Sequence, residues 1–550
     1  MRAWLHVGAG FRLDAHNIGL IGRLCRLLDG SPLAIELAAS WVRRLTIDEI
    51  VQAIAANPDF LAADLPDLPA RHHSMRAVFE QSWELLEPEE QRAMCRLSLF
   101  RGGLDAPTAH ELLGDHSFAE LAALQDASLL QRSADGRYGM HVLVAQFANE
   151  HLNHDPAEAA AARAAHTDYV GRLLTATAAR LGGAEQAEAL AAFDREIVNI
   201  RTAWDRVVAA ADWPALERMC EGLAMGMDAR GRFEEALDCL QRAAAALAAH
   251  PAPEAGFVLS RVLAARAGQC ERLGRYDEGI ALLRRALRLS GGPQVHHDRA
   301  RILGVLGRIM ERRGRFQSAI RLHRQSLDCA RAAGNSPAEA NAYHNLASAY
   351  EGLMEYAEVR RLVQNSLRLR RANGDLRGVA LSLNLLGIAA EMQSAYDEAR
   401  MHYQESLALM GGLGNHWERA LPLSNLGDVC VTLGELAAAC VYYAEALELA
   451  QHYWSVPNML MFMVKLAQLL QHTTANAAAV ELIGPALIHP GADAVFREQA
   501  RRLLGALGDS MPAEQFRAAL IRGQARSLSE AVAFAIKLSR RSALPGMHPD

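Results

Sequence analysis

Amide, histidine and hydroxyl side chains recur at related positions in the second half of the chain. Asn345 and Asn425 lie eighty residues apart, and His344, Asn384 and Ser424 lie beside or near equivalent positions. An amide side chain carries both donors and an acceptor, so a row of such side chains can hold an extended peptide backbone. This spacing predicts a groove that binds a protein or peptide partner. The alternative is a solvated polar face.

Four rows of residues show the repeat that positions these side chains. Large apolar residues stand at forty-residue steps at Tyr276, Phe316, Tyr356, Tyr396 and Leu436. The other rows are Ala286, Ser326, Ser366, Ser406, Ala446 and Ala486; Gly307, Ala347, Gly387 and Gly427; and Ala319, Val359, Ala399 and Ala439. Self-similarity at one period predicts a solenoid, in which each unit buries its apolar face against its neighbours.

Each unit is predicted to contain two helices joined by a short turn. Gly274 and Gly314 stand at this turn, where glycine suits the left-handed residue that ends a helix. The segments Tyr-Asp-Glu-Gly at Tyr276 and Tyr-Asp-Glu-Ala at Tyr396 resemble the tetratricopeptide repeat, which is commonly about 34 residues long. The longer step implies longer helices. We therefore expect an all-α fold dominated by a tetratricopeptide-like α-solenoid.

Composition limits the classes of partner and the cellular location. The 550 residues carry a net charge of −6, so no basic field favours nucleic acid. The eight cysteines are scattered without a Cys-x-x-Cys pair, which is typical of buried thiols in a reducing cytosol. No apolar run of about 18 residues and no signal peptide is present. We expect a cytoplasmic protein that does not contact the membrane.

No residue pattern indicates catalysis or a metal site. His110 and His116 have the wrong spacing for two zinc ligands on one helical face. The histidine pairs that begin at His72 and His296 are expected on the surface, and no Gly-x-Ser-x-Gly nucleophile elbow occurs. We therefore expect no enzyme activity, no catalytic residue and no metal ligand.

Residues 1–72 are predicted to form a small helical domain, in which Thr46 and Glu49 have the spacing of a capping box. The Gly-Ser-Pro-Leu-Ala segment around Pro32 resembles the Gly-Leu-Pro-Leu-Ala segment of signal-transduction ATPases with numerous domains. These include AfsR-, MalT- and LuxR-type bacterial regulators. The segment follows the nucleotide-binding core in that family, so the resemblance implies that Pro32 lies against the adenine. A proline that starts a helix is the alternative.

Residues 73–155 are predicted to be short helices, a two-stranded hairpin and a closing helix. This order resembles the winged-helix domain of the same family. The candidate recognition helix, residues 118–127, carries Glu120 and Asp126 and no basic residue. Groove binding requires phosphate neutralisation and donors to base edges. We therefore expect no direct DNA binding, and the resemblance implies an intramolecular clamp.

The pair Met140 and His141 resembles the Met-His-Asp motif of this family, although Val142 replaces the aspartate. The resemblance implies that His141 contacts the phosphate of a bound nucleotide, and a histidine donor suits that contact because its charge can be tuned. A local hydrogen bond at a strand-to-helix junction is the alternative.

The phosphate loop of the family, Gly-x-x-x-x-Gly-Lys-Ser/Thr, is missing, because Lys465 is the first lysine of the chain. We expect that the nucleotide-binding core is absent, and that the sequence is either a piece of a longer chain or a relic that kept the regulatory part. No cofactor is expected in this chain. If a core were supplied, ATP or ADP would be bound, with contacts at Pro32 and His141.

The rest of the chain divides into a helical linker at 156–212, repeats at 213–490, and a C-terminal helical cap and tail at 491–550. Segments around Asn199 and Ser527 resemble the stretches that flank the repeats in AfsR-type ATPases. Ser527 and Glu530 have the spacing of a capping box, which predicts a final helix.

These patterns predict a non-catalytic regulatory protein, namely the sensor and autoinhibitory portion of a signal-transduction ATPase-type transcriptional regulator. Its superhelix is expected to bind a protein or peptide partner, which releases an autoinhibited state, and ligand-dependent self-association is a further expectation. Two alternatives stay open. One is a transcription factor that reads DNA through the winged helix, and the other is an ATPase completed by a missing N-terminal domain.

Overall fold

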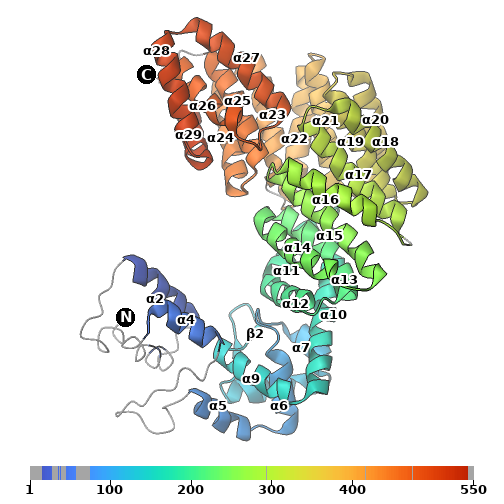
Figure 1. The fold of residues 1–550 in the computed structure, drawn as a ribbon, viewed down its shortest axis with the longest axis vertical. Helices are drawn as coiled ribbons and strands as arrows, with labels where there is room; N and C mark the ends of the chain where they lie inside the picture. The colour runs from blue at the N-terminus through green and yellow to red at the C-terminus, as the bar shows by residue number, and fades with distance from the viewer. Residues whose placement is uncertain are drawn as a thin grey trace. The chain divides into compact units, whose positions relative to one another are not determined.

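The computed structural model describes residues 15–27, 35, 38, 45–56, 75–292, 294–414, 417–472 and 475–542. These residues are almost entirely helical and fold into two compact units (Figure 1). The first unit comprises Met1–Val170 and Arg195–Arg206, and the second comprises Gly171–Asp194 and Val207–Asp550. The expected all-α fold is confirmed. Pro32 lies outside the described residues.

The first unit is built from short helices. They are α2 (Ala15–Leu27), α4 (Ile47–Ala56), α5 (Met75–Glu84), α6 (Pro88–Leu97), α7 (Ala106–Leu113), α8 (Ser117–Asp126) and α9 (Val142–His154). The capping box predicted before α4 is present. The Thr46 amide donates to the Glu49 carboxylate at 2.8 Å, and the Glu49 amide donates to the Thr46 hydroxyl at 3.3 Å.

A small hairpin lies between α8 and α9. Strand β1 (Gln131–Arg132) pairs antiparallel with β2 (Tyr138–Gly139), and Tyr138 also bridges to Leu104. Buried residues of α6, α8 and α9 form the core beneath it. The predicted order of helices, hairpin and closing helix is therefore observed, while its assignment as a winged helix stays a prediction.

The second unit is a long series of helices. Two helices before the series are divided between the units, namely α10 (Pro156–Arg180), which the boundary at Val170 divides, and α12 (Ile197–Ala209), which belongs mainly to the first unit. The series opens with α11 (Gln186–Arg195), α13 (Trp213–Ala229) and α14 (Phe233–Ala248). The central pairs are α15 (Pro253–Arg272) with α16 (Tyr276–Leu289), α17 (Val295–Arg312) with α18 (Phe316–Ala332), α19 (Ser336–Glu351) with α20 (Tyr356–Ala372), and α21 (Leu376–Met392) with α22 (Tyr396–Gly412). The last elements are η4 (Trp417–Arg419), α23 (Ala420–Thr432), α24 (Leu436–His452), α25 (Val456–Gln471), α26 (Asn476–Ile488), α27 (Ala494–Ser510), α28 (Ala513–Ala525) and α29 (Leu528–Ser542).

The repeat rows seen in the sequence mark fixed places in these pairs. The row from Tyr276 to Leu436 supplies the first residue of each second helix, from α16 to α24. The turn before it holds Gly274 and Gly314 at φ of 72° and 69°, as expected for a left-handed helix end. The predicted α-solenoid of helix pairs is confirmed.

The serine row ties the two helices of each pair together. The hydroxyls of Ser326, Ser366 and Ser406 are buried and donate to backbone carbonyls of the preceding first helix at 2.7–2.8 Å. In the earlier pair, Ala286 replaces this serine and the bond runs the other way, from the Ser260 hydroxyl to the Ala286 carbonyl at 2.8 Å. One hydrogen bond thus fixes the register of both helices in each of these pairs.

The array coils, so that its first helices contact its later ones. The Gln186 amide donates to the Leu413 carbonyl at 3.2 Å, and the Tyr276 hydroxyl donates to the Gly491 carbonyl at 3.4 Å. At the end of the series, Ser527 and Glu530 form the predicted capping box before α29. The interior of this coil is where a cavity forms.

Candidate functional site

The first helix of each pair turns one face toward the interior of the coil. On α17 this face carries Arg301, Gly304, Val305 and Arg308, and steps of three or four residues place side chains on one side of a helix. Corresponding faces of the first helices from α13 to α25 surround a cavity of about 570 Å3. The repeat itself therefore builds the cavity.

Small residues leave the space open. Ala224, Ala264 and Gly304 occupy one row of the wall, at a position that the next repeat fills with His344. A Cβ atom added at Gly268, on α15, would meet no other atom within 4 Å. The early repeats thus leave room that a bound molecule can occupy.

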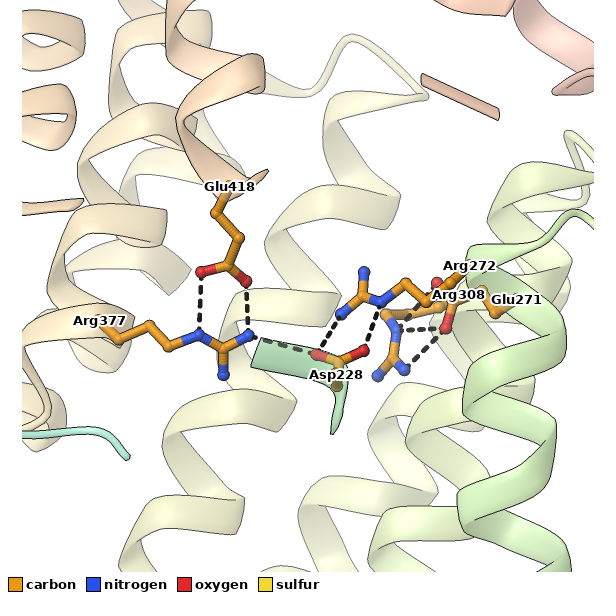
Figure 2. Close-up of polar contacts among 6 residues, drawn as sticks. All are labelled: Asp228, Glu271, Arg272, Arg308, Arg377 and Glu418. Carbon is orange, nitrogen blue, oxygen red and sulfur yellow. Dashed lines mark hydrogen bonds and ion pairs between the residues drawn. The ribbon is translucent and has the colours of Figure 1, made fainter. Parts of the chain in front are cut away.

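Six charged side chains form a network in the cavity wall, in which four are linked to one another and the other two, Arg308 and Glu271, form an adjacent pair (Figure 2). They are Asp228, Glu271, Arg272, Arg308, Arg377 and Glu418. Arg377 donates from Nε to Glu418 at 2.9 Å and lies 3.8 Å from Asp228, which accepts a bond from Arg272 at 3.0 Å. Because Asp228 belongs to α13 and Arg377 to α21, this network joins repeats that are far apart along the chain.

The network keeps its charges despite burial. Burial raises the pKa of the Glu271 carboxyl, but Arg308, which donates two hydrogen bonds to it at 2.8 and 3.0 Å, and Arg272 together hold that pKa below its usual range. Burial alone would lower the pKa of the Arg377 guanidinium. The neighbouring Glu418 carboxylate has the larger effect, so the pKa is raised above its usual value. The neighbouring charges thus favour the ionised forms of Glu271 and Arg377.

Trp417 packs beside this network. Its ring meets Phe233 edge-on at a centroid distance of 5.7 Å, and the Arg272 guanidinium lies 4.7 Å from the ring centre. Trp417 is 4% exposed, and its Nε1 has no hydrogen-bond partner among the described residues. This aromatic contact joins α14 to the segment before α23 and supports the closure of the coil.

His344 and Arg370 form a buried polar cluster in the same wall. Arg370 is 2% exposed and donates to Ser382 Oγ at 2.6 Å, to Asn341 Oδ1 at 3.0 Å and to His344 Nδ1 at 3.4 Å. Burial lowers the pKa of Arg370 to about 10. Burial, Arg370 and Arg308 hold the pKa of His344 well below its usual value. His344 is therefore neutral, with its proton on Nε2.

Arg301 has weaker partners than the arginines of the network. Its nearest carboxylate, Glu221, lies 4.0 Å away, which is beyond hydrogen-bond distance. One terminal nitrogen donates to the Arg261 carbonyl at 3.4 Å, and Nε is buried without a partner among the described residues. This guanidinium therefore keeps donors that a bound group can use.

The structure separates the residues that the repeat spacing had grouped. His344 and Asn345 lie in the cavity wall. Asn425 donates to Asn384 at 3.0 Å and accepts from Lys465 at 3.2 Å, and these residues lie outside that wall. Ser424 is fully buried. A contact between any of these five side chains and a partner stays a prediction.

Sequence reasoning missed the charged residues of the wall. Glu271, Glu311, Glu351 and Glu391 form a row at the same forty-residue step, and Arg261 and Arg301 form another. Of these residues, Glu271 and Arg301 line the cavity. These rows were visible in the sequence. What the rows could not show is which charges meet, because Arg377 and Asp228 come together only when the array coils.

A second cavity, of about 480 Å3, lies within the first unit around His141. Four arginines line it, namely Arg101, Arg132, Arg137 and Arg195, with Asp135 as the acidic residue among the lining residues. His141 Nδ1 accepts a hydrogen bond from the Leu143 amide at 3.2 Å, which is the local contact of a helix cap. This basic setting suits a phosphate or another anion.

The described part of the chain contains neither a metal-binding cluster nor a membrane-spanning helix. No group of three or more His, Cys, Asp or Glu side chains there is arranged to hold a metal ion. No helix of the described residues combines the length and the apolar character needed to cross a membrane.

Comparison with known proteins supports the reading of the repeats. Two models described as tetratricopeptide repeat match, one at residues 259–332 and 338–411 and the other at residues 423–453. The chain carries tetratricopeptide repeats. The matched residues include α17 and α19, which contribute to the cavity wall.

Curated and solved proteins are similar to parts of the chain. A protein of Mycobacterium tuberculosis named as a candidate HTH-type transcriptional regulator is 32% identical over 214 residues, which is 36% of this chain and 24% of that protein. The chain thus spans about a quarter of the length of this relative. A Pyrococcus horikoshii signal-transduction ATPase with a tetratricopeptide repeat sensor is 15% identical, with a TM-score of 0.41, and the match covers 88% of this chain and 74% of that chain. A Rap protein complexed with competence and sporulation factor is 12% identical, with a TM-score of 0.46, and the match covers 68% and 99% of the two chains.

Proposed function

We propose that this chain is a non-catalytic regulatory protein that binds a protein or peptide partner inside its tetratricopeptide superhelix. The observation that carries this proposal is the cavity of about 570 Å3 in the interior of the coil. Pockets of about 300–1,000 Å3 are typical of sites for small ligands and short segments. A folded domain would not fit, so the partner inserts a short segment.

The lining favours a peptide over an apolar ligand. Asn341, Asn345 and Asn458 contribute to the wall, and an amide side chain carries both donors and an acceptor. Asn341 keeps its amide donors for a ligand, because only its Oδ1 is used, by Arg370. An extended peptide presents unpaired N–H and C=O groups along its length, which such side chains can satisfy. Buried, hydrogen-bonded side chains such as Arg370 keep the wall rigid, which lowers the entropy lost on binding.

We propose further that the chain is the sensor and autoinhibitory portion of a transcriptional regulator of the signal-transduction ATPase type. The ordered motifs around Pro32, His141 and the repeats support this, as does the relative named as a candidate regulator. In this proposal the first unit is a clamp rather than a DNA reader, because α8 carries Glu120 and Asp126 and no base. Partner binding in the cytoplasm would release the clamp and allow self-association.

A peptide selection tests the proposed binding site. Immobilised full-length chain would be used to select from a library of random hexapeptides, and affinities would be measured by calorimetry. A Gly268→Leu variant fills the cavity without a backbone clash, because a Cβ at this site has open space. Gly256 lies on the same helix, has the same open space and does not line the cavity, so Gly256→Leu is the matched control.

The proposal predicts that selected peptides bind the wild type and Gly256→Leu equally, and bind Gly268→Leu at least about tenfold more weakly, since one blocked side-chain position costs 1.4 kcal/mol or more. Equal binding to all three proteins would contradict it. So would a library from which the wild type selects nothing.

A second candidate function is contact with a nucleotide phosphate, and the basic cavity around His141 favours it. ADP or pyrophosphate would be titrated into the chain by calorimetry. Binding that is lost in a His141→Ala variant supports the contact. Binding that is unchanged in this variant would assign the anion to the surrounding arginines instead.

A further inference from the structure

We infer that the partner enters the cavity with a carboxylate group, and that this group binds the guanidinium of Arg301 in place of Glu221. This inference rests on the proposed function and names the chemistry of its ligand. It is carried by the pairing of charges in the wall, by the row of residues that contains Arg301, and by the exposure of the two side chains involved.

The other wall arginines are already committed to partners. Arg272, Arg308 and Arg377 each donate to a carboxylate within 3.0 Å, and Arg370 donates to Ser382 at 2.6 Å and lies 3.7 Å from the Asp375 carboxylate. Arg312 lies 3.4 Å from Asp493. Taking one of these cations for a ligand would leave a buried carboxylate uncompensated, which is costly.

Arg301 can change partners at low cost. Its contact with Glu221 is 4.0 Å long, and the Glu221 side chain is 54% exposed, so water can solvate Glu221 once it is displaced. Arg301 itself is 28% exposed and therefore remains accessible from the cavity. A planar guanidinium and a carboxylate form two parallel hydrogen bonds, which a loose contact of this length does not provide.

The charges of the wall favour an anionic ligand. Glu221, Asp228, Glu271 and Glu418 line the cavity together with six arginines. Three of these acids are paired with Arg272, Arg308 and Arg377, which leaves the exposed Glu221 beside Arg301. The wall is thus suited to a carboxylate at Arg301, from either a peptide terminus or an organic acid.

The residues at one repeat position change in character along the cavity, and this change predicts the orientation of the bound peptide. The row that contains Glu221, Arg261 and Arg301 continues as Asn341, Leu381 and Leu421, and all of these except Arg261 line the cavity. The wall therefore changes from charged to amide to apolar along consecutive repeats. We expect the carboxylate at Arg301, peptide groups at Asn341 and Asn345, and an apolar side chain near Leu381 and Leu421.

The span of this row sets the length of the ligand. Packed helices are about 8–10 Å apart, so Arg301 and Leu381, two repeats apart, are separated by about 16–20 Å. An extended chain covers about 3.3–3.6 Å per residue, so about five or six residues fit. This length suits a peptide whose terminal carboxylate binds Arg301 better than it suits a small organic acid.

The test compares random hexapeptide libraries with a free C-terminal carboxylate and with a C-terminal amide. Each would be selected against the wild type, Arg301→Gln, Arg301→Lys and Glu221→Gln. Arg299 lies on the same helix, is exposed and does not line the cavity, so Arg299→Gln is the control. Succinate and citrate would be titrated as the organic acid arm.

We expect selected acid peptides to bind the wild type and Arg299→Gln about tenfold or more tightly than their amides do. In Arg301→Gln this preference should vanish, and Arg301→Lys should keep only part of it because an ammonium cannot form the two parallel bonds. Glu221→Gln should bind acid peptides about threefold more tightly, because the competing carboxylate is gone.

Acid and amide peptides that bind equally to the wild type would overturn this inference and leave the proposed function standing, provided that Gly268→Leu still blocks both. An acid preference that persists in Arg301→Gln would also overturn it. Succinate or citrate that binds as tightly as the peptides would overturn the assignment of a peptide terminus. A wild type that binds no peptide would refute the proposed function itself.

Discussion

At the scale of single residues, glycine and a ring side chain are matched across the two helices of a repeat. A Cβ atom added at Gly427 would lie 2.7 Å from the Tyr443 ring, and Gly387 stands in the same relation to Tyr403. In the preceding repeat, Ala347 stands at the glycine position and Val363 stands at the ring position. The size of the residue at the small-residue position therefore varies inversely with the size of the side chain on the opposite helix.

This matching predicts that Gly387→Ala is destabilising and that Tyr403→Val rescues it. The added methyl overlaps the Tyr403 ring, and overpacking of this kind costs about 1–3 kcal/mol. The double variant reproduces the residue types of the neighbouring repeat. Urea unfolding of the four proteins gives the coupling energy, which should be about 1–3 kcal/mol in favour of the double variant. Additive effects would show that the two positions do not share one space.

Glu351 is a partly buried acid whose ionisation opposes folding. Burial, and secondarily Glu311, raise its pKa to about 7. In two other repeats the equivalent acid is hydrogen-bonded, since His323 contacts Glu311 and Tyr403 donates to Glu391 at 2.7 Å. Because the pKa in the folded protein exceeds the ordinary glutamate value of 4.5, the stabilisation from this group is complete below pH 4.5 and is lost as the pH rises through 7.

Glu351→Gln should therefore stabilise the protein at alkaline pH and not in acid. We expect the free energy of unfolding at pH 8 to rise by about 1–2 kcal/mol and to be unchanged at pH 4.5. Glu405→Gln, at an exposed site on α22, is the control. A gain of equal size at both pH values would mean that ionisation of Glu351 is not the cause.

At the scale of elements, the turn between the two helices of a repeat needs a left-handed residue. Glycine supplies it at Gly274, Gly314 and Gly434, but Met354 and Ser394 adopt φ of 62° and 61° at the equivalent positions. A side chain with a Cβ is strained in this region. Two repeats therefore keep an energetic cost that the others avoid.

Met354→Gly should relieve this strain. Met354 is 74% exposed, so little packing is lost, and we expect a gain of about 0.5–1 kcal/mol in the free energy of unfolding. The reverse change, Gly434→Met, should cost a similar amount, because the space at Gly434 is open and only the backbone conformation resists. Denaturant unfolding measures both variants. A destabilised Met354→Gly would contradict the strain argument.

Local elements were predictable because their causes are local. Capping boxes at Thr46 and Ser527 and the left-handed turn at Gly314 depend on residues within one helical turn, and each is observed. The contacts between the two helices of a pair depend on the residues of one repeat only. The cavity site could not be predicted in this way, because its residues come from repeats that meet only after the array coils.

At the scale of the second unit, one ion network closes the coil. Glu418 is 3% exposed and is paired with Arg377, which also lies near Asp228. The angle between successive repeats accumulates along a solenoid, so no single repeat determines which distant charges meet. For this reason His344 could be assigned to an interior face from the sequence, but Arg377 and Asp228 could not be assigned to one cluster.

Removing one partner of this network should be more costly than removing both. Arg377→Met removes the guanidinium that pairs with the buried Glu418 carboxylate, which should lower the free energy of unfolding by about 3–5 kcal/mol. Adding Glu418→Leu should recover most of this loss. Arg313→Met is the control, because Arg313 pairs with the exposed Asp277 and should matter by less than about 1 kcal/mol. A double variant no more stable than Arg377→Met would contradict the pairing.

The most direct test of the binding cavity is amide hydrogen exchange of the full chain with and without a selected hexapeptide. We expect the peptide to slow exchange in α15, α17, α19 and α21, whose faces line the cavity, and to leave α16 and α22, which contribute no lining residue, unchanged. The same peptide should have no effect on Gly268→Leu. Protection confined to the second helices of the pairs, or protection that persists in the blocked variant, would show that the partner binds elsewhere.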